Sequence, residues 1–508
     1  MKRIFTILLF AVLFLPVSKS QVHPLTIESA DLINELDKKQ FHPAIAEQGR
    51  NEIVYQYLQK HYRGLNEISI KDEVRAESIT CSVDDSLALV AFYNKMNGVN
   101  WTYKDNWLSE NPVRDWWGVT VENSRVTAIE FYINYDATQN VTGNFAEELF
   151  GLDALEVLNL ARNSVTGAIP SAIEGLSSLK HLDLSWNQIS GQIPTELASL
   201  SELEFLHLGS NQLTGGLIPE LGNLSKLRSL IMWNNQLSGT IPAELANLSY
   251  LNELSISENQ LTGTIPIELG DMPNLIKLLL NDNQLEGSIP SELGNLLNID
   301  LLSLSGNYLS GSIPANLGNL SSLTCMYLSR NQLSGTLPAE LGDITNMYHF
   351  SVEYNMLEGE IPAEIGNYSN MDYLFISNNQ FTHLPDLTGL TSLFNILAGS
   401  NYFDFADLER AGIDWSDEHY HYAPQRKLVA PDTLKNGDQL TLIANIGGTG
   451  NVYTWFKNGV EIETSTSNTI TVTNVTNDYY SCKATNSQFP DPGLAVEKVS
   501  LQTYSQCH

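Results

Sequence analysis

The sequence predicts a repeat solenoid built on a parallel β-sheet, followed by a small all-β domain. Three observations support this prediction. An asparagine recurs at a constant interval through the middle of the chain, and each one follows a short stretch in which leucines alternate with variable residues. After residue 427 this pattern gives way to short alternating segments. A fixed period of about 24 residues indicates stacked repeat units, and alternation with a period of two indicates strands.

Composition excludes several classes of protein. The chain has 508 residues, with 27 Lys and Arg against 58 Asp and Glu, and its formal net charge is −31. This acid excess excludes nucleic-acid binding through a general basic surface, because phosphate affinity comes from lysine and arginine. Four cysteines in a chain of this length exclude a small scaffold held together by disulfides.

Residues 1–20 have the pattern of a secretory signal peptide. Lys2 and Arg3 precede an apolar run over residues 4–17, which small residues follow. The run is too short to span a membrane comfortably. We therefore expect cleavage near Gln21, a secreted or cell-surface protein, and no transmembrane segment in the mature chain. Residues 21–80 contain helix-like stretches to which the pattern assigns no role.

The repeats occupy residues 126–402. From Asn163, equal steps along the chain reach Asn187, Asn211, Asn235, Asn259, Asn283, Asn307, Asn331, Asn355 and Asn379. The alternating leucines should fill one continuous core, because a single repeat cannot close a core alone. The asparagine amides, with two donors and an acceptor each, should satisfy backbone groups where the strands turn.

The repeat unit, L-x-x-L-x-L-x-x-N-x-L-x-G-x-I-P-x-E-L-G-N-L, resembles the plant-type leucine-rich repeat of plant receptor ectodomains and secreted bacterial proteins. The resemblance implies a superhelical solenoid with an exposed parallel sheet on its concave face. Residues 81–125, which begin with an amphipathic helix near Asp85, resemble the N-terminal cap of such solenoids. Residues 403–427 are expected to form a C-terminal cap.

The predicted N-terminal cap departs from the family at its cysteines. Asp115 and Val121 stand near the positions where the family usually has cysteines, so this cap lacks that disulfide. We expect tryptophans to cover the core instead, namely Trp101, Trp107, Trp116 and Trp117.

Residues 428–508 resemble an immunoglobulin-like sandwich of the kind appended to bacterial surface proteins. Trp455 lies in an apparent third strand, and the sequence Asp-Tyr-Tyr-x-Cys ends at Cys482. Ala444 stands near the place of the first cysteine of such domains. We therefore expect Cys482 to have no partner between the sheets.

The candidate binding residues are those that the repeat leaves variable on the open face of the sheet. They are Asp183, Trp186, Phe205, His207, Trp233, Tyr327, His349, Tyr354, Tyr373 and Phe375. Exposed aromatic side chains on a rigid surface can anchor a peptide or stack on sugars. The competing interpretation is that these large residues only cover their neighbours on the sheet.

Glutamates recur at another repeat position, namely Glu196, Glu220, Glu244, Glu268, Glu292, Glu340 and Glu364. We interpret this column as a solvated outer face and not as a ladder of cation sites, because the repeat itself fixes the position.

These patterns predict a non-catalytic recognition or adhesion protein that binds an extracellular protein, peptide or glycan and needs no cofactor or metal. Two alternatives remain. One is a structural surface or matrix component without a dedicated ligand. The other is a metal-dependent enzyme that uses His419 and His421, which alternate along a segment that we interpret as a capping strand.

Overall fold

The computed structural model describes residues 81–109, 111–131, 140–423, 425, 432–436, 439–444, 446–473, 479–495 and 499–500. The predicted signal peptide and residues 21–80 lie outside these ranges. Within them, no helix is both long enough and apolar enough to cross a membrane.

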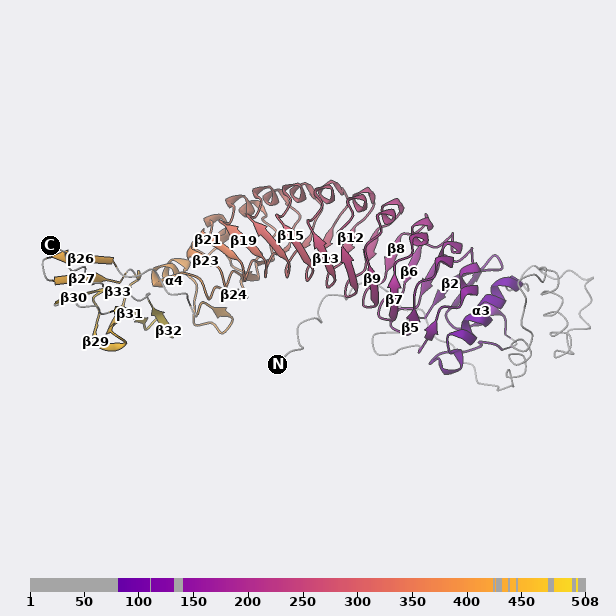
Figure 1. The fold of residues 1–508 in the computed structure, drawn as a ribbon, viewed down its shortest axis with the longest axis horizontal. Helices are drawn as coiled ribbons and strands as arrows, with labels where there is room; N and C mark the ends of the chain where they lie inside the picture. Colours follow the sequence, from indigo (N-terminus) through magenta and orange to yellow (C-terminus); the bar gives the residue numbers. More distant parts are fainter. Residues whose placement is uncertain are drawn as a thin grey trace, which may run out of the picture. The chain divides into compact units, whose positions relative to one another are not determined.

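A long sheet runs through the solenoid, and its strands lie side by side in chain order (Figure 1). The pairing is parallel from β2 onward, and each strand of the repeats pairs in register with the equivalent strand of the next coil, as β6 pairs with β8. The described strands are β1 (Val119–Glu122), β2 (Arg125–Glu130), β4 (Val157–Asn159), β6 (His181–Asp183), β8 (Phe205–His207), β10 (Ser229–Ile231), β12 (Glu253–Ser255), β14 (Lys277–Leu279), β16 (Leu301–Ser303), β18 (Cys325–Tyr327), β20 (His349–Ser351), β22 (Tyr373–Phe375), β24 (Asn395–Leu397) and β25 (Tyr420–His421).

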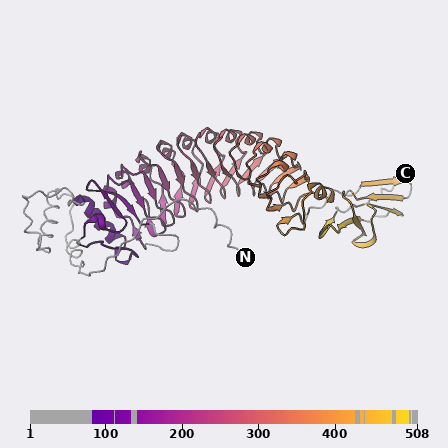
Figure 2. The same cartoon turned by 180° about the vertical axis from the view of Figure 1, so that it is seen from behind.

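The coils from β2 to β22 each also contribute one strand to a second parallel sheet and, in most of them, one turn of 3₁₀ helix. Figure 2 shows the stacked coils from behind. The second sheet contains β3 (Thr142–Asn144), β5 (Ser164–Gly167), β7 (Gln188–Gln192), β9 (Gln212–Gly215), β11 (Gln236–Gly239), β13 (Gln260–Gly263), β15 (Gln284–Gly287), β17 (Tyr308–Gly311), β19 (Gln332–Gly335), β21 (Met356–Glu360) and β23 (Gln380–His383). The helical turns are η4 (Glu147–Gly151), η5 (Ser171–Gly175), η6 (Thr195–Ser199), η7 (Pro219–Asn223), η8 (Ala243–Asn247), η9 (Ile267–Asp271), η10 (Ser291–Asn295), η11 (Ala315–Asn319), η12 (Ala339–Asp343) and η13 (Ala363–Asn367).

The predicted core and asparagine column are confirmed. Leu182 and Leu184 are fully buried, like the leucines at the same positions of the other repeats. Asn259 shows the bonding of the column: its Oδ1 accepts from Leu237 N (3.0 Å), and its Nδ2 donates to Met232 O (3.0 Å) and Ile256 O (3.2 Å). Each asparagine therefore joins its own turn to the preceding coil.

One repeat period after the last asparagine of the column, the equivalent position holds a glutamine. Asn401 is the last asparagine of the column, with its Oδ1 accepting from Phe381 N at 3.1 Å. Gln425 lies 24 residues after it; the glutamine Oε1 accepts from Asn401 N (3.0 Å), and its Nε2 donates to Ala398 O (3.1 Å). A glutamine thus performs the asparagine's task where the repeats end.

Helix α3 (Val83–Lys95) covers the first coil, together with the short turns η2 (Gly98–Asn100) and η3 (Val113–Asp115). It begins shortly before the predicted start at Asp85, because Ser82 caps it by accepting from Asp85 N at 3.1 Å. Trp101, Trp107 and Trp116 are buried, as predicted, and Trp117 is half-buried.

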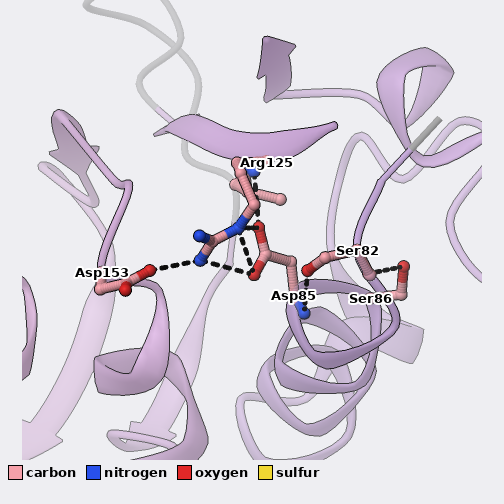
Figure 3. A network of polar contacts seen from close by, with 6 residues as sticks. Ser82, Asp85, Ser86, Arg125 and Asp153 are labelled. Atoms are coloured by element: carbon pink, nitrogen blue, oxygen red, sulfur yellow. Dashed lines mark hydrogen bonds and ion pairs between the residues drawn. The ribbon is translucent and has the colours of Figure 1, made fainter. Parts of the chain in front are cut away.

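A buried carboxylate attaches this helix to the sheet (Figure 3). Asp85 is 1% exposed, and its Oδ2 accepts from the backbone N–H of Val126 at 2.7 Å and from Arg125 Nε at 3.1 Å. Arg125 also forms an ion pair with Asp153 in the next coil. The charge that burial would penalise is thus fully paired.

After the last repeats, helix α4 (Phe405–Ala411) begins with a capping box between Asp404 and Asp407. The C-terminal strands are antiparallel and form two sheets. One contains β26 (Asp432–Asn436), β27 (Gln439–Ile443) and β30 (Thr469–Thr473); the other contains β28 (Asn451–Lys457), β29 (Val460–Ser465), β31 (Tyr479–Asn486), β32 (Phe489–Ala495) and β33 (Val499–Ser500).

The first prediction concerns the asparagine column. Replacing Asn259 with alanine leaves the buried Leu237 N–H unpaired and removes one of the two amide donors to Met232 O and to Ile256 O. We expect Asn259→Ala to lower the free energy of unfolding by about 2 kcal/mol, because one buried polar group left unpaired costs about 1–3 kcal/mol. Equilibrium unfolding in urea, followed by circular dichroism, measures the change.

Gln260→Ala is the matched control, since this neighbouring amide is exposed. An equal loss of stability in the two variants would contradict a special role for the column.

Candidate functional site

The open face of the long sheet carries the first and third side chains of each short strand. In β6, for example, Leu182 points into the core, whereas His181 and Asp183 on either side of it remain partly exposed. The same alternation holds in β8, β18 and β22. Because strand residues alternate between faces, the variable residues of successive coils meet on one surface.

The residue just before each column asparagine adds a further side chain to this surface. In most coils it adopts a left-handed conformation; φ is 56° for Trp186 and 55° for Tyr354. Such conformations are uncommon for aromatic residues. These two residues are 45% and 51% exposed, so the turn presents a large aromatic ring to solvent.

The structure places all ten predicted site residues on this face, and none of them is fully buried. These residues form two separate clusters. Two arginines and one histidine, which were not among the predicted site residues, belong to the same clusters.

We define the first patch as Arg162, His181, Asp183, Trp186, Phe205, His207 and Trp233. The rings of Trp186 and Trp233 meet edge to face with centroids 5.2 Å apart, and the Arg162 guanidinium lies 5.1 Å from the centroid of the Trp186 ring. The His181 ring lies 5.4 Å from that of Phe205 and 5.7 Å from that of His207.

We define the second patch as Tyr327, Arg330, His349, Tyr354, Tyr373 and Phe375. His349 is at its centre, with ring centroids at 4.6 Å from Tyr327, 5.0 Å from Tyr373 and 4.9 Å from Phe375. The Arg330 guanidinium lies 5.5 Å from the Tyr354 ring.

The two patches occupy the same positions of different coils. Five residues of the first patch have a counterpart in the second, seven coils further along the sheet. The pairs are Arg162 and Arg330, His181 and His349, Trp186 and Tyr354, Phe205 and Tyr373, and His207 and Phe375. The sheet therefore presents a similar arrangement of arginine, histidine and aromatic rings twice, in one register.

Electrostatics differ between the two patches. Burial lowers the pKa of His349 to about 4, and its Nε2 is buried without a hydrogen-bond partner in the described part of the chain. In the first patch, burial and the neighbouring His207 lower the pKa of His181. Burial would raise the pKa of Asp183, but its interactions with His207 and Ser185 outweigh burial and lower it.

Within the described residues, one group of three side chains has its potential metal-ligand atoms within 4.8 Å of one another, namely His181, Asp183 and His207. His419, which suggested the enzymatic alternative, instead contacts Asp417 Oδ1 through Nδ1 at 2.9 Å, and its ring lies 4.6 Å from that of Phe394. Comparing equivalent repeat positions along the sequence would have identified Arg162 and His181, because the same residue types recur at Arg330 and His349.

The comparisons with known proteins agree with the repeat architecture. One leucine-rich-repeat family model matches residues 148–213 and 225–285, and a second matches residues 298–320 and 322–344. The coils of this solenoid are therefore leucine-rich repeats. The comparison with curated proteins gave no match.

Several solved structures are similar to this chain. The PEPR1–AtPEP1 complex has 29% identity and a TM-score of 0.56, over 68% of this chain and 52% of that one. The Arabidopsis receptor kinase HAESA, in complex with the peptide hormone IDA and the co-receptor SERK1, has 28% identity and a TM-score of 0.55, over 68% and 62%.

A third similar structure is the leucine-rich-repeat ectodomain of the Arabidopsis thaliana receptor kinase GASSHO1/SCHENGEN3, in complex with CASPARIAN STRIP INTEGRITY FACTOR 2. It has 30% identity and a TM-score of 0.52, over 63% of this chain and 44% of that one. This chain thus spans about half of the length of the PEPR1 and GASSHO1 chains that it matches.

The low pKa of His349 makes stability depend on pH. An unfolded histidine has a pKa of about 6.5, so between pH 6.5 and pH 4 the unfolded chain binds a proton at this position that the folded chain does not. The stabilising contribution is complete above pH 6.5 and is lost as the pH falls toward 4, up to about 3 kcal/mol. His349→Phe should lose less stability than wild type over this range.

Urea unfolding at several pH values measures the difference. His421→Phe is the control, because its side chain is exposed. If wild type and His349→Phe lose equal stability on acidification, burial of a neutral His349 is not the cause.

Proposed function

We propose that this chain is an exported, non-catalytic recognition protein whose long sheet binds an extended segment of an extracellular peptide or protein. The observation that supports this proposal most strongly is the repetition of one aromatic patch in one register along one rigid face. Side chains that only covered their neighbours would have no reason to gather into two matched clusters.

The separation of the patches suggests the length of the ligand. Adjacent strands lie about 4.8 Å apart, so seven coils separate the patches by about 34 Å. An extended peptide advances about 3.3 Å per residue and needs about ten residues to reach from one patch to the other. The similar receptor kinase HAESA, solved in complex with a peptide hormone, supports a peptide over a glycan as the ligand.

Each patch can act as an anchor in such a complex. We propose as contact residues Asp183, Trp186, Phe205, His207, Trp233, Tyr327, His349, Tyr354, Tyr373 and Phe375, joined by Arg162, His181 and Arg330. Tryptophan, tyrosine and arginine are the side chains that most often dominate binding energy. The stacked coils hold these groups in place before binding, which limits the entropy lost when the ligand docks.

We further propose that residues 428–508 form an immunoglobulin-like module that acts as a spacer or second contact, with export directed by residues 1–20. Trp455 on β28 is fully buried and pairs in register with the buried Cys482 on β31, which is a free thiol. Phe489 stacks on Phe405 of α4 at 5.6 Å, and Gly447 N donates to Asp404 Oδ2 at 2.7 Å. These contacts favour a module fixed to the end of the solenoid.

Peptides selected by the purified full chain from a displayed library of random dodecapeptides test the proposal. We expect Trp186→Ala and Tyr354→Ala each to weaken binding of a selected peptide about tenfold or more, which corresponds to at least about 1.4 kcal/mol. Truncating that peptide to about half its length should remove the effect of one of the two substitutions. Isothermal titration calorimetry gives the affinities.

Tyr308→Ala is the matched control, because Tyr308 is 56% exposed but belongs to β17 of the second sheet. Selected peptides that bind both patch variants as tightly as wild type would contradict the proposed face. Failure of peptides, secreted proteins and glycans alike to bind would instead favour a structural component without a ligand.

A further inference from the structure

Three potential metal ligands meet within the first patch, on two neighbouring strands. His181 and Asp183 are the first and third residues of β6, and His207 is the third residue of β8, paired in register with Asp183. One ligand atom from each lies within 4.8 Å of the other two, and His207 Nδ1 is 3.9 Å from Asp183 Oδ2. The parallel pairing thus brings together residues that lie a full coil apart in the chain.

Hydrogen bonds on the outer side of the cluster orient two of the three ligands. Asp183 Oδ1 accepts from the backbone N–H of Ser185 at 2.9 Å and from its hydroxyl at 2.6 Å, which leaves Oδ2 on the side of His207. His207 Nε2 lies 3.0 Å from Ser229 Oγ, so its Nδ1 is the nitrogen that faces the carboxylate. Partners of this kind fix ring orientation in metal sites.

His181 supplies an independent observation. Its Nε2 is buried and has no hydrogen-bond partner in the described part of the chain. A buried polar atom without a partner is costly. Coordination of a cation through this nitrogen would remove that cost.

We propose that His181, Asp183 and His207 bind one divalent transition-metal ion, for which Zn²⁺ is the natural probe. Two imidazoles and one carboxylate suit Zn²⁺ and its neighbours in the first row, whereas Ca²⁺ and Mg²⁺ prefer oxygen ligands alone. Zinc takes such ligands at about 2.0–2.2 Å, so the three side chains must draw closer than they now lie. Three protein ligands leave a position for water.

The repeat itself provides the matched control. His349 occupies the position of His181 seven coils later, but Ser351 and Phe375 stand there in place of Asp183 and His207. The second patch therefore has one imidazole at this position and lacks the other two ligands, so His349→Ala changes an equivalent histidine without touching the proposed site.

Titration of the chelator-treated full chain with Zn²⁺, followed by calorimetry, tests the proposal. We expect one ion per chain, and about tenfold or greater loss of affinity in each of His181→Ala, Asp183→Asn and His207→Ala, with no change in His349→Ala. Absence of one-to-one binding by wild type, or equal affinity in all variants, would overturn the site.

His207→Cys keeps the test decisive where an alanine variant unfolds. A thiolate can replace an imidazole as ligand, and with Co²⁺ as probe it should add a sulfur-to-metal absorption band in the near ultraviolet that wild type lacks. A folded His207→Cys chain that binds Co²⁺ without this band would show that residue 207 is not a ligand. Because peptide binding is measured separately, failure here leaves the proposed function intact.

Discussion

The hydrogen bonding of the asparagine column is the constraint on which the rest of this structure depends. Every coil must turn at the end of its short strand, and this turn buries backbone N–H and C=O groups that need the asparagine side chain as a hydrogen-bond partner. Asn259 accepts from one coil and donates to both that coil and its own. Because each amide needs the neighbouring coil at a fixed distance, the column sets the spacing and the phase of every repeat. The leucine core and the strand register then follow from that phase.

Much of the architecture could be predicted from this periodicity, but the grouping of the site could not. The period assigned Leu182 to the core and Trp186 to the open face, and both assignments hold. The left-handed turn at Trp186 and the guanidinium of Arg162 beside its ring were missed, because both lie at positions where the repeat tolerates any side chain. His181 was missed for the same reason. Such contacts depend on which variable residues lie on adjacent coils, and that information appears only when equivalent positions are compared across coils.

The positions of the charged side chains also follow the repeat period. The recurring glutamates, such as Glu244 and Glu268, lie in the first turn of successive 3₁₀ helices, where they are exposed. Elsewhere, acidic and basic side chains of neighbouring coils pair across one period, as Lys180 does with Glu156 at 2.7 Å and Lys226 with Glu202 at 2.6 Å. Seven of the acidic side chains thus belong to one position of the scaffold, whereas the two patches of the open face contain rings, imidazoles, two arginines and the carboxylate of Asp183.

Because the period is fixed, the distance between the two patches is a whole number of strand spacings. Inserting or removing one whole coil between β10 and β18 would move the patches apart or together by a single strand spacing, about 4.8 Å, and leave each of them unaltered. Inserting or removing part of a coil is not possible in the same way, because it would separate the asparagine amides from their hydrogen-bond partners in the neighbouring coil. Unequal recombination within the repeated segment would thus change the distance between the two patches in steps of one strand spacing. The residues of each patch would stay the same.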